Sequence, residues 1–161
     1  RELDSRSYVI TPNLTEALLL LYGKEEMEKK WKVLETMPEA ERLEKIQEIG
    51  QRLVLEFSLS AVVITGVNYR ENSQTPKMGN LVLEKEKVSW VFAEKSGGSY
   101  SGTGDLFASV LSAGLVKGYS METCAHMAVE FISTSIRDAV SEETDRNDGV
   151  CFEAHLGMLL S

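Results

Sequence analysis

The sequence is poor in cysteine and in basic residues, and each shortage excludes a class of protein. Its two cysteines, Cys124 and Cys151, stand alone, without the spacing of a metal site or of a disulfide framework. The 17 basic residues are outnumbered by 25 acidic ones, and the net charge is -8. No nucleic-acid partner is expected, because basic patches are what bind phosphate backbones. Isolated thiols favour a reducing compartment, and we expect a cytoplasmic protein.

Long hydrophobic runs are also missing. None approaches the roughly 20 residues of a bilayer-spanning helix, so no membrane partner is expected, and the start, Arg1–Asp4, does not have the pattern of a signal peptide. The composition, 43% hydrophobic and 26% charged, is that of an ordinary globular protein. We expect residues 1–161 to form a single α/β domain.

Short apolar runs alternate with helix-prone segments along the chain. Ser60–Gly66 is a continuous apolar run closed by turn residues, which is typical of a strand buried on both faces of a parallel sheet. The order of strand, helices and strand predicts a mostly parallel sheet flanked by helices. Strands are expected at 8–10, 60–66, 81–83 and 88–92, a loop at 68–79, and helices at 14–22, 24–37, after Pro38 up to 57, from about 105 to Gly118, and at 121–140.

A glycine-rich stretch, Gly97–Asp105, precedes an apolar run that predicts a buried helix from Leu106 to Val116. Unpaired backbone N–H groups and the positive end of the helix dipole make such a junction an anion site. Its glycine spacing fits neither a P-loop, which needs a lysine, nor a dinucleotide fingerprint. Bare backbone donors beside one carboxylate, Asp105, suit a kinase that deprotonates a hydroxyl. A plain glycine turn whose aspartate only favours the helix dipole is the competing interpretation.

Other polar residues have structural interpretations. Asn13 and Glu16 form a capping-box pattern before an apolar helix, and such boxes are common helix starts. His126 lies opposite the apolar face of its helix, four residues before Glu130, and is expected to be solvated. His155 is given the same interpretation. The charges of the helix after Pro38, Arg42 among them, are expected to form a solvated face.

Three stretches together resemble the pyridoxal kinase branch of the ribokinase-like superfamily: Thr11–Ala17, Val63–Gly66 and Tyr100–Phe107. The resemblance is strongest over residues 8–22 and 60–118. The run Gly-Thr-Gly-Asp-Leu-Phe is specific, because sugar kinases usually carry Ala at the position of Thr103. Hydroxymethylpyrimidine kinases often carry Cys at the position of Asp105. The resemblance implies the C-terminal half of a ribokinase-like fold, the nucleotide-binding half, with the substrate-binding half absent from this sequence.

The resemblance also implies an activity, the ATP-dependent phosphorylation of the 5′-hydroxymethyl group of pyridoxal, pyridoxine or pyridoxamine. Asp105 would be the general base, and the backbone amides of Gly102, Thr103 and Gly104 would form the anion hole. Glu16 would help to hold Mg²⁺. The residues expected to bind ATP are Asn13, Thr65, Gly66, Ser101, Thr103 and Gly104. Gly66 departs from many relatives, which carry a hydroxyl residue there.

The implied ligands are ATP, Mg²⁺ and a B6 vitamer, with the need for a monovalent cation left open, and the implied assembly is a homodimer. Two alternatives stay open. One is a kinase of the same fold that acts on hydroxymethylpyrimidine or a sugar. The other is an ATP-binding fragment without catalysis.

Overall fold

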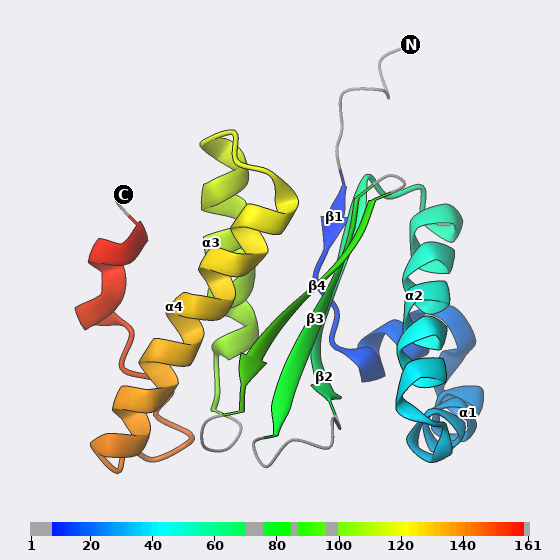
Figure 1. The fold of residues 1–161 in the computed structure, drawn as a ribbon, viewed down its shortest axis with the longest axis horizontal. Coiled ribbons are helices and arrows are strands. Elements are labelled where there is room, and N and C mark those ends of the chain that lie inside the picture. Colours follow the sequence, from blue (N-terminus) through cyan, green and yellow to red (C-terminus); the bar gives the residue numbers. More distant parts are fainter. Residues whose placement is uncertain (1–7, 70–75, 85–86, 96–99, 160–161) are drawn as a thin grey trace. The chain divides into compact units, whose positions relative to one another are not determined.

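The computed structural model describes residues 8–69, 76–84, 87–95 and 100–159. A four-stranded open sheet in the order β1-β2-β3-β4 is flanked by helices (Figure 1). This confirms the expected α/β class. The elements in chain order are β1 (Val9–Ile10), α1 (Leu14–Thr36), α2 (Glu39–Glu56), β2 (Ala61–Tyr69), β3 (Lys77–Glu84), β4 (Lys87–Glu94), α3 (Thr103–Val116), α4 (Met121–Ser141) and the 3-10 helix η2 (Glu153–Leu159).

The chain divides into two compact units. The first comprises residues 1–72 and 79–90, and the second comprises residues 73–78 and 91–161. The division falls within β3 and β4, so each unit takes part of both strands. Each unit is described by itself below.

The first unit is built around β2. This strand pairs in parallel with β1, with Val9 opposite Ala61 and Ile10 opposite Val62. Ala61 to Ile64 are all at most 1% exposed, as expected of a strand covered on both faces. Helices α1 and α2 pack against β2 and against each other (Figure 1), and Leu18, Ile46 and Leu53 are fully buried in that core.

Local signals set the helix boundaries of this unit. Asn13 caps α1, and the predicted break at Gly23 is present, because Gly23 has φ 71° and ψ 175°. The second helical segment follows at once, so α1 continues after the kink to Thr36. Pro38 stands at the N-cap position of α2, as expected. Proline suits a helix start because it lacks the N–H that would be unpaired there.

Arg42 corrects the expectation of a wholly solvated face on α2. Its side chain is 2% exposed. Its guanidinium pairs with the Glu39 carboxylate at 2.7 Å and donates to the backbone carbonyl of Asn68 in β2. Sequence periodicity could not reveal this, because the acceptor on β2 comes from a distant part of the chain.

The polar segment 68–79 is only in part a loop. β2 continues to Tyr69 and β3 begins at Lys77, while residues 70–75 lie outside the described residues. The strands expected at 81–83 and 88–92 are present as β3 and β4, which are neighbours in the sheet and separated in the chain by residues 85–86 alone. Both strands are longer than expected, since β3 extends to Glu84 and β4 begins at Lys87.

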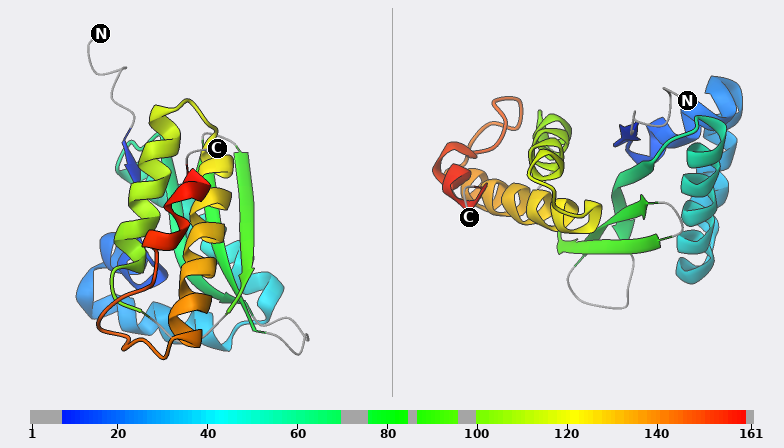
Figure 2. Two further views of the ribbon diagram at one scale, coloured as in Figure 1. Left: turned by 90° about the vertical axis from the view of Figure 1, so that its left-hand side faces the viewer. Right: turned by 90° about the horizontal axis from the view of Figure 1, so that it is seen from above.

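In the second unit, α3 and α4 lie side by side, and η2 packs against α4 (Figure 2). Gly118, with φ 86°, follows the end of α3 as predicted. The helix is not buried all round, however. Phe107, Val110 and Leu111 are buried, whereas Val116 is 89% exposed. Of the helices in the described ranges, none is long and apolar enough to cross a membrane.

Candidate functional site

The predicted residues of the first unit gather just beyond the end of β1, beside the middle of β2; Thr65 and Gly66 were expected at the end of a strand, but β2 continues past them to Tyr69. Asn13 forms an isolated parallel bridge with Thr65, and the Thr65 N–H donates to the Pro12 carbonyl at 2.9 Å. The Asn13 N–H donates to Glu16 Oε2 at 2.8 Å, and the Glu16 N–H donates to Asn13 Oδ1 at 2.9 Å. The capping box is therefore complete, and it follows the carboxyl end of β1, the end of a parallel strand at which open α/β sheets bind ligands.

Gly66 follows Thr65 with φ 71°, a conformation that favours glycine. Its N–H donates to Oδ1 of the buried Asn80 at 3.3 Å. A Cβ at this position would meet nothing within 4 Å. Gly66 therefore offers open space beside Thr65, while its own N–H is already engaged by Asn80.

The predicted residues of the second unit form the start of α3. Gly102 is the N-cap residue, with φ 79° and ψ -4°, and no described side chain caps the helix. The Thr103 hydroxyl donates to the Tyr100 carbonyl at 3.2 Å, which closes the turn before the helix. The first N–H groups of a helix have no partner within the helix. Here they lie next to Asp105, which is in the first turn and exposed.

A cavity of about 440 Å³ lies at this helix start. One side is formed by the beginning of α3 and the turn before it: Ser101, Gly102, Asp105, Leu106 and Ser109. The other side is the segment after α4: Asn147, Asp148, Gly149, Val150, Phe152 and Glu153. The two sides are joined by the Ser101 N–H, which donates to the Arg146 carbonyl at 3.0 Å. Asp105 thus lines a cavity beside an uncapped helix start, as the kinase hypothesis requires.

The cavity wall at 147–153 was not predicted. Asp145 to Gly149 is rich in turn-forming residues, and Gly149 adopts φ 92°. That composition could have indicated a structured turn, but not its position next to Asp105. The earlier glycines of the predicted loop, Gly97 and Gly98, lie outside the described residues.

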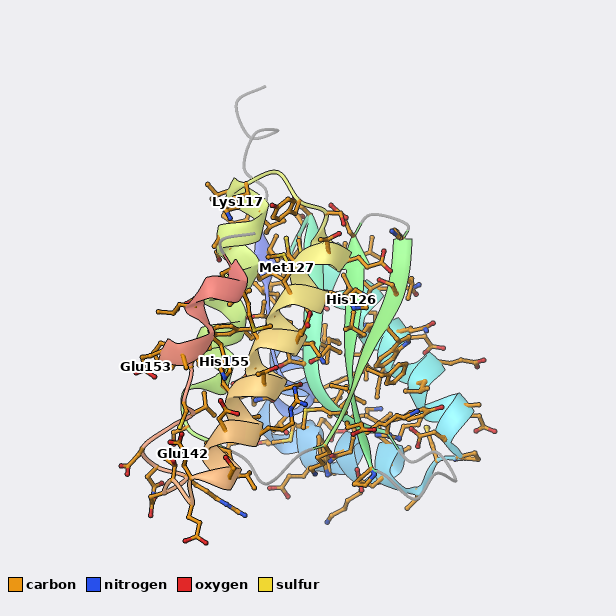
Figure 3. The ribbon with its side chains drawn as sticks, turned by 60° about the vertical axis from the view of Figure 1, so that its left-hand side comes forward. Lys117, His126, Met127, Glu142, Glu153 and His155 are labelled. Atoms are coloured by element: carbon orange, nitrogen blue, oxygen red, sulfur yellow. The ribbon has the colours of Figure 1, made fainter. Side chains whose placement is uncertain are left out.

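The two histidines differ, although one interpretation was given to both. His126 is exposed, as expected. His155 is 17% exposed, and its Nε2 lies 2.7 Å from Asp138 Oδ2 on α4. The solvated interpretation of His155 was therefore wrong. Figure 3 shows His155 between η2 and α4, and His126 nearer to the start of α4.

No three His, Cys, Asp or Glu side chains among the described residues gather as a metal cluster. A Mg²⁺ ion bound with a nucleotide keeps several waters and needs only one or two carboxylates beside the phosphates. Glu16 fits that role, because the capping box uses only Oε2 of its carboxylate. A second hollow, of about 300 Å³, lies along α1 and includes none of the predicted residues.

The structure thus brings the predicted residues together as two sets, one in each unit. Asn13, Glu16, Thr65 and Gly66 form the first set. Residues 101–105 form the second.

The family model described as phosphomethylpyrimidine kinase matches residues 1–149. The chain belongs to this family. The match covers both sets of predicted residues. Among curated proteins, none is significantly similar to this member of the phosphomethylpyrimidine kinase family.

Solved structures agree with the family. A protein of Bacteroides thetaiotaomicron, assigned as a phosphomethylpyrimidine kinase, is 27% identical in sequence, with a TM-score of 0.75 over 95% of this chain and 48% of that one. A second crystal form of that protein, with pyridoxal, has a TM-score of 0.74 and 27% sequence identity over 95% of this chain and 49% of that one. The chain spans about half the length of these structures.

More distant structures share the fold. Pyridoxal kinase from Lactobacillus plantarum is 24% identical, with a TM-score of 0.67 over 94% of this chain and 49% of that one. Plasmodium falciparum PdxK, with the ligands AMP-PNP and PL, is 19% identical, with a TM-score of 0.64 over 95% of this chain and 46% of that one. The ribokinase-like fold predicted from the resemblance is therefore confirmed.

Proposed function

We propose that the chain is the nucleotide-binding half of a kinase that transfers a phosphoryl group from ATP to the 5′-hydroxymethyl group of a B6 vitamer. The observation that carries the proposal is the position of Asp105, in the first turn of a helix that no described side chain caps, with its side chain at a cavity of about 440 Å³. Phosphoryl transfer asks a protein mainly for positioning and charge neutralisation, and this junction supplies a carboxylate and backbone donors.

In this proposal Asp105 accepts the proton of the attacking hydroxyl group. The backbone N–H groups of Gly102, Thr103 and Gly104 bind the oxygens of the moving phosphoryl group. The left-handed conformation of Gly102 and the Thr103–Tyr100 hydrogen bond fix the turn that presents these donors. The backbone donors are therefore in place before substrate binds, and preorganised donors need no rearrangement during the reaction. Ser101 is proposed to bind the nucleotide from the same turn.

The residues that follow β1, together with Thr65 and Gly66 in β2, are proposed to bind the nucleotide phosphates and Mg²⁺. Bound Mg²⁺ would neutralise the charge of the phosphates, which a chain of net charge -8 does not do by itself. Glu16 would hold the ion through its second carboxylate oxygen or through water, and Asn13 and Thr65 would contact the phosphates. Gly66 would contribute space for a phosphate, since its N–H is bonded to Asn80.

The B6 vitamer is proposed as the acceptor on two grounds. The glycine stretch carries aspartate, Asp105, where hydroxymethylpyrimidine kinases often carry cysteine, and the similar Bacteroides protein was crystallised with pyridoxal. Hydroxymethylpyrimidine is the second candidate acceptor, because the matching family model is that of phosphomethylpyrimidine kinase. We also propose a cytoplasmic homodimer.

The test is a steady-state phosphorylation assay of the full-length protein with ATP and pyridoxal, hydroxymethylpyrimidine or ribose. We expect the highest kcat/KM with pyridoxal. Equal or faster turnover of hydroxymethylpyrimidine would support the second candidate. If calorimetry showed ATP binding but no acceptor were phosphorylated, the kinase proposal would be rejected. The protein would then be a nucleotide-binding module without catalysis.

A further inference from the structure

The helix η2 borders the Asp105 cavity, and none of its seven residues, all of them described, is fully buried. Exposed side chains gain little from the hydrophobic effect, so polar contacts contribute to its position. Its first residue, Glu153, lines the cavity together with Phe152 and Val150. Val150 is buried in a hydrophobic cluster with Tyr100 and Ala139, and Phe152 packs against that cluster. The contacts that hold η2 therefore act on the Glu153 end of this wall, and the cluster holds its Val150 end.

Polar contacts hold η2 at two points. Near its start, His155 Nε2 lies 2.7 Å from Asp138 Oδ2, and at its end Lys117 Nζ donates to the Leu159 carbonyl at 2.9 Å. Because a carboxylate oxygen accepts, Nε2 of His155 is the donor. This bond ties η2 to α4, and it is half-buried, with His155 17% and Asp138 42% exposed. Figure 3 shows His155 on the side of η2 that faces α4.

We propose that His155 is a positioning residue that, through Asp138, holds the wall from Val150 to Glu153 against the Asp105 cavity. Its effect on catalysis rests on the function proposed above, whereas its effect on the wall does not. Hydrogen bonds to charged groups are among the stronger ones. Losing this bond should therefore raise, by about tenfold, the population in which the wall from Val150 to Glu153 has moved away from the cavity.

Cys151 reports on this wall without any assay of activity. It stands between two residues that line the cavity, and its thiol is half-buried, 3.4 Å from Glu142 Oε2 and 3.6 Å from the Thr144 hydroxyl. Cys124 is fully buried in α4 and becomes accessible only when the unit unfolds. Comparing the two thiols therefore separates local opening from global unfolding.

The experiment compares His155→Ala, His155→Gln and the control His126→Ala in the whole protein. Thiol labelling by a disulfide reagent is followed at each cysteine by mass spectrometry, together with kcat and KM. For His155→Ala we expect Cys151 to react about tenfold faster while Cys124 is unchanged, and kcat/KM to fall by a similar factor. His155→Gln keeps an N–H donor at a comparable reach and should restore both readouts. His126→Ala should change neither.

Several results would overturn the inference. Equal acceleration at both cysteines would mean that His155 contributes only to global stability. An unchanged rate at Cys151 would mean that the bond does not hold the wall. Faster labelling of Cys151 with normal kcat/KM would remove His155 from any role in catalysis. The wild-type protein could transfer no phosphate while His155→Ala still speeds the labelling of Cys151 and not that of Cys124. In that case the proposed function fails and the positioning of the wall stands.

Discussion

Asn13 pairs with Thr65 just beyond the end of β1, so a helix cap meets β2 directly after the buried run of that strand. The capping bonds between Asn13 and Glu16 are made at the same place, at 2.8 and 2.9 Å. A capping box and a ligand site are therefore compatible here, because the box leaves one Glu16 oxygen for another partner. The two interpretations of Glu16, a helix cap and a Mg²⁺ ligand, differ in what its negative charge does. The charge should affect Mg²⁺ binding only if Glu16 is a ligand.

Replacing Glu16 by glutamine separates these roles. Glutamine keeps an oxygen that can accept from the Asn13 N–H, so the cap and the stability should be nearly unchanged. The lost charge should raise the Mg²⁺ concentration that gives half-maximal activity. Asn13→Ala is the complementary variant, because it removes the cap and should lower the free energy of unfolding by about 1 kcal/mol. An unaltered Mg²⁺ requirement in Glu16→Gln would return Glu16 to a capping role alone.

Asp105→Asn tests the proposed base. The amide is similar in size but cannot accept the hydroxyl proton, so kcat should fall by about 10² to 10⁴. The ATP dissociation constant from calorimetry should change little, since backbone donors are proposed to bind the phosphoryl group. Glu130→Gln, an exposed carboxylate on α4, is the control and should leave kcat unaltered. A loss of less than tenfold in Asp105→Asn would remove Asp105 from the role of base.

Features set by neighbouring residues were predictable from the sequence. The Asn13 cap, the break at Gly23, the start of α2 after Pro38 and the glycine after α3 follow from local backbone chemistry. The buried run of β2 was predictable because four consecutive apolar residues leave no solvent face. The turn before α3 and the place of Asp105 in the first turn of that helix follow from the same local chemistry, and the role of Asp105 stays a prediction.

Features that depend on distant parts of the chain were not predictable. Arg42 has the charge and spacing of a surface residue, and only the Asn68 carbonyl on β2 explains its burial. His155 has no charged partner near it in sequence, since Asp138 lies on another helix. The position of the wall at 147–153 beside Asp105 depends on the fold, because about 40 residues separate the two in the sequence.

Gly102 and Gly104 form a matched pair at the start of α3. At both positions a Cβ would meet nothing within 4 Å, but only Gly102 has a positive φ, 79°. Gly102→Ala should therefore lower the free energy of unfolding by about 1 to 2 kcal/mol. Gly104→Ala should raise it by about 0.5 to 1 kcal/mol, because alanine favours the helix. Urea unfolding measures both, and equal shifts in the two variants would mean that the conformation of Gly102 carries no strain for alanine.

The final prediction concerns Arg42, whose buried charge joins α2 to β2. Arg42→Met keeps most of the side-chain volume but leaves the Glu39 carboxylate and the Asn68 carbonyl without this donor. Breaking a buried pair by removing one partner costs about 3 to 5 kcal/mol. Glu39 keeps some contact with water, being 22% exposed, so we expect about 3 kcal/mol from urea unfolding.

The matched control is Lys45→Met on the same helix. Lys45 pairs with Glu48 at the same three-residue separation, but both side chains are about half exposed, at 47% and 57%. Such surface pairs contribute little, so the loss should be no more than about 0.5 kcal/mol. If the two variants lost equal stability, the burial of Arg42 would have no energetic consequence. A large loss in Arg42→Met alone would identify its burial and its contact with β2 as the reason, because both variants replace a basic residue of an i,i+3 pair on the same helix by methionine.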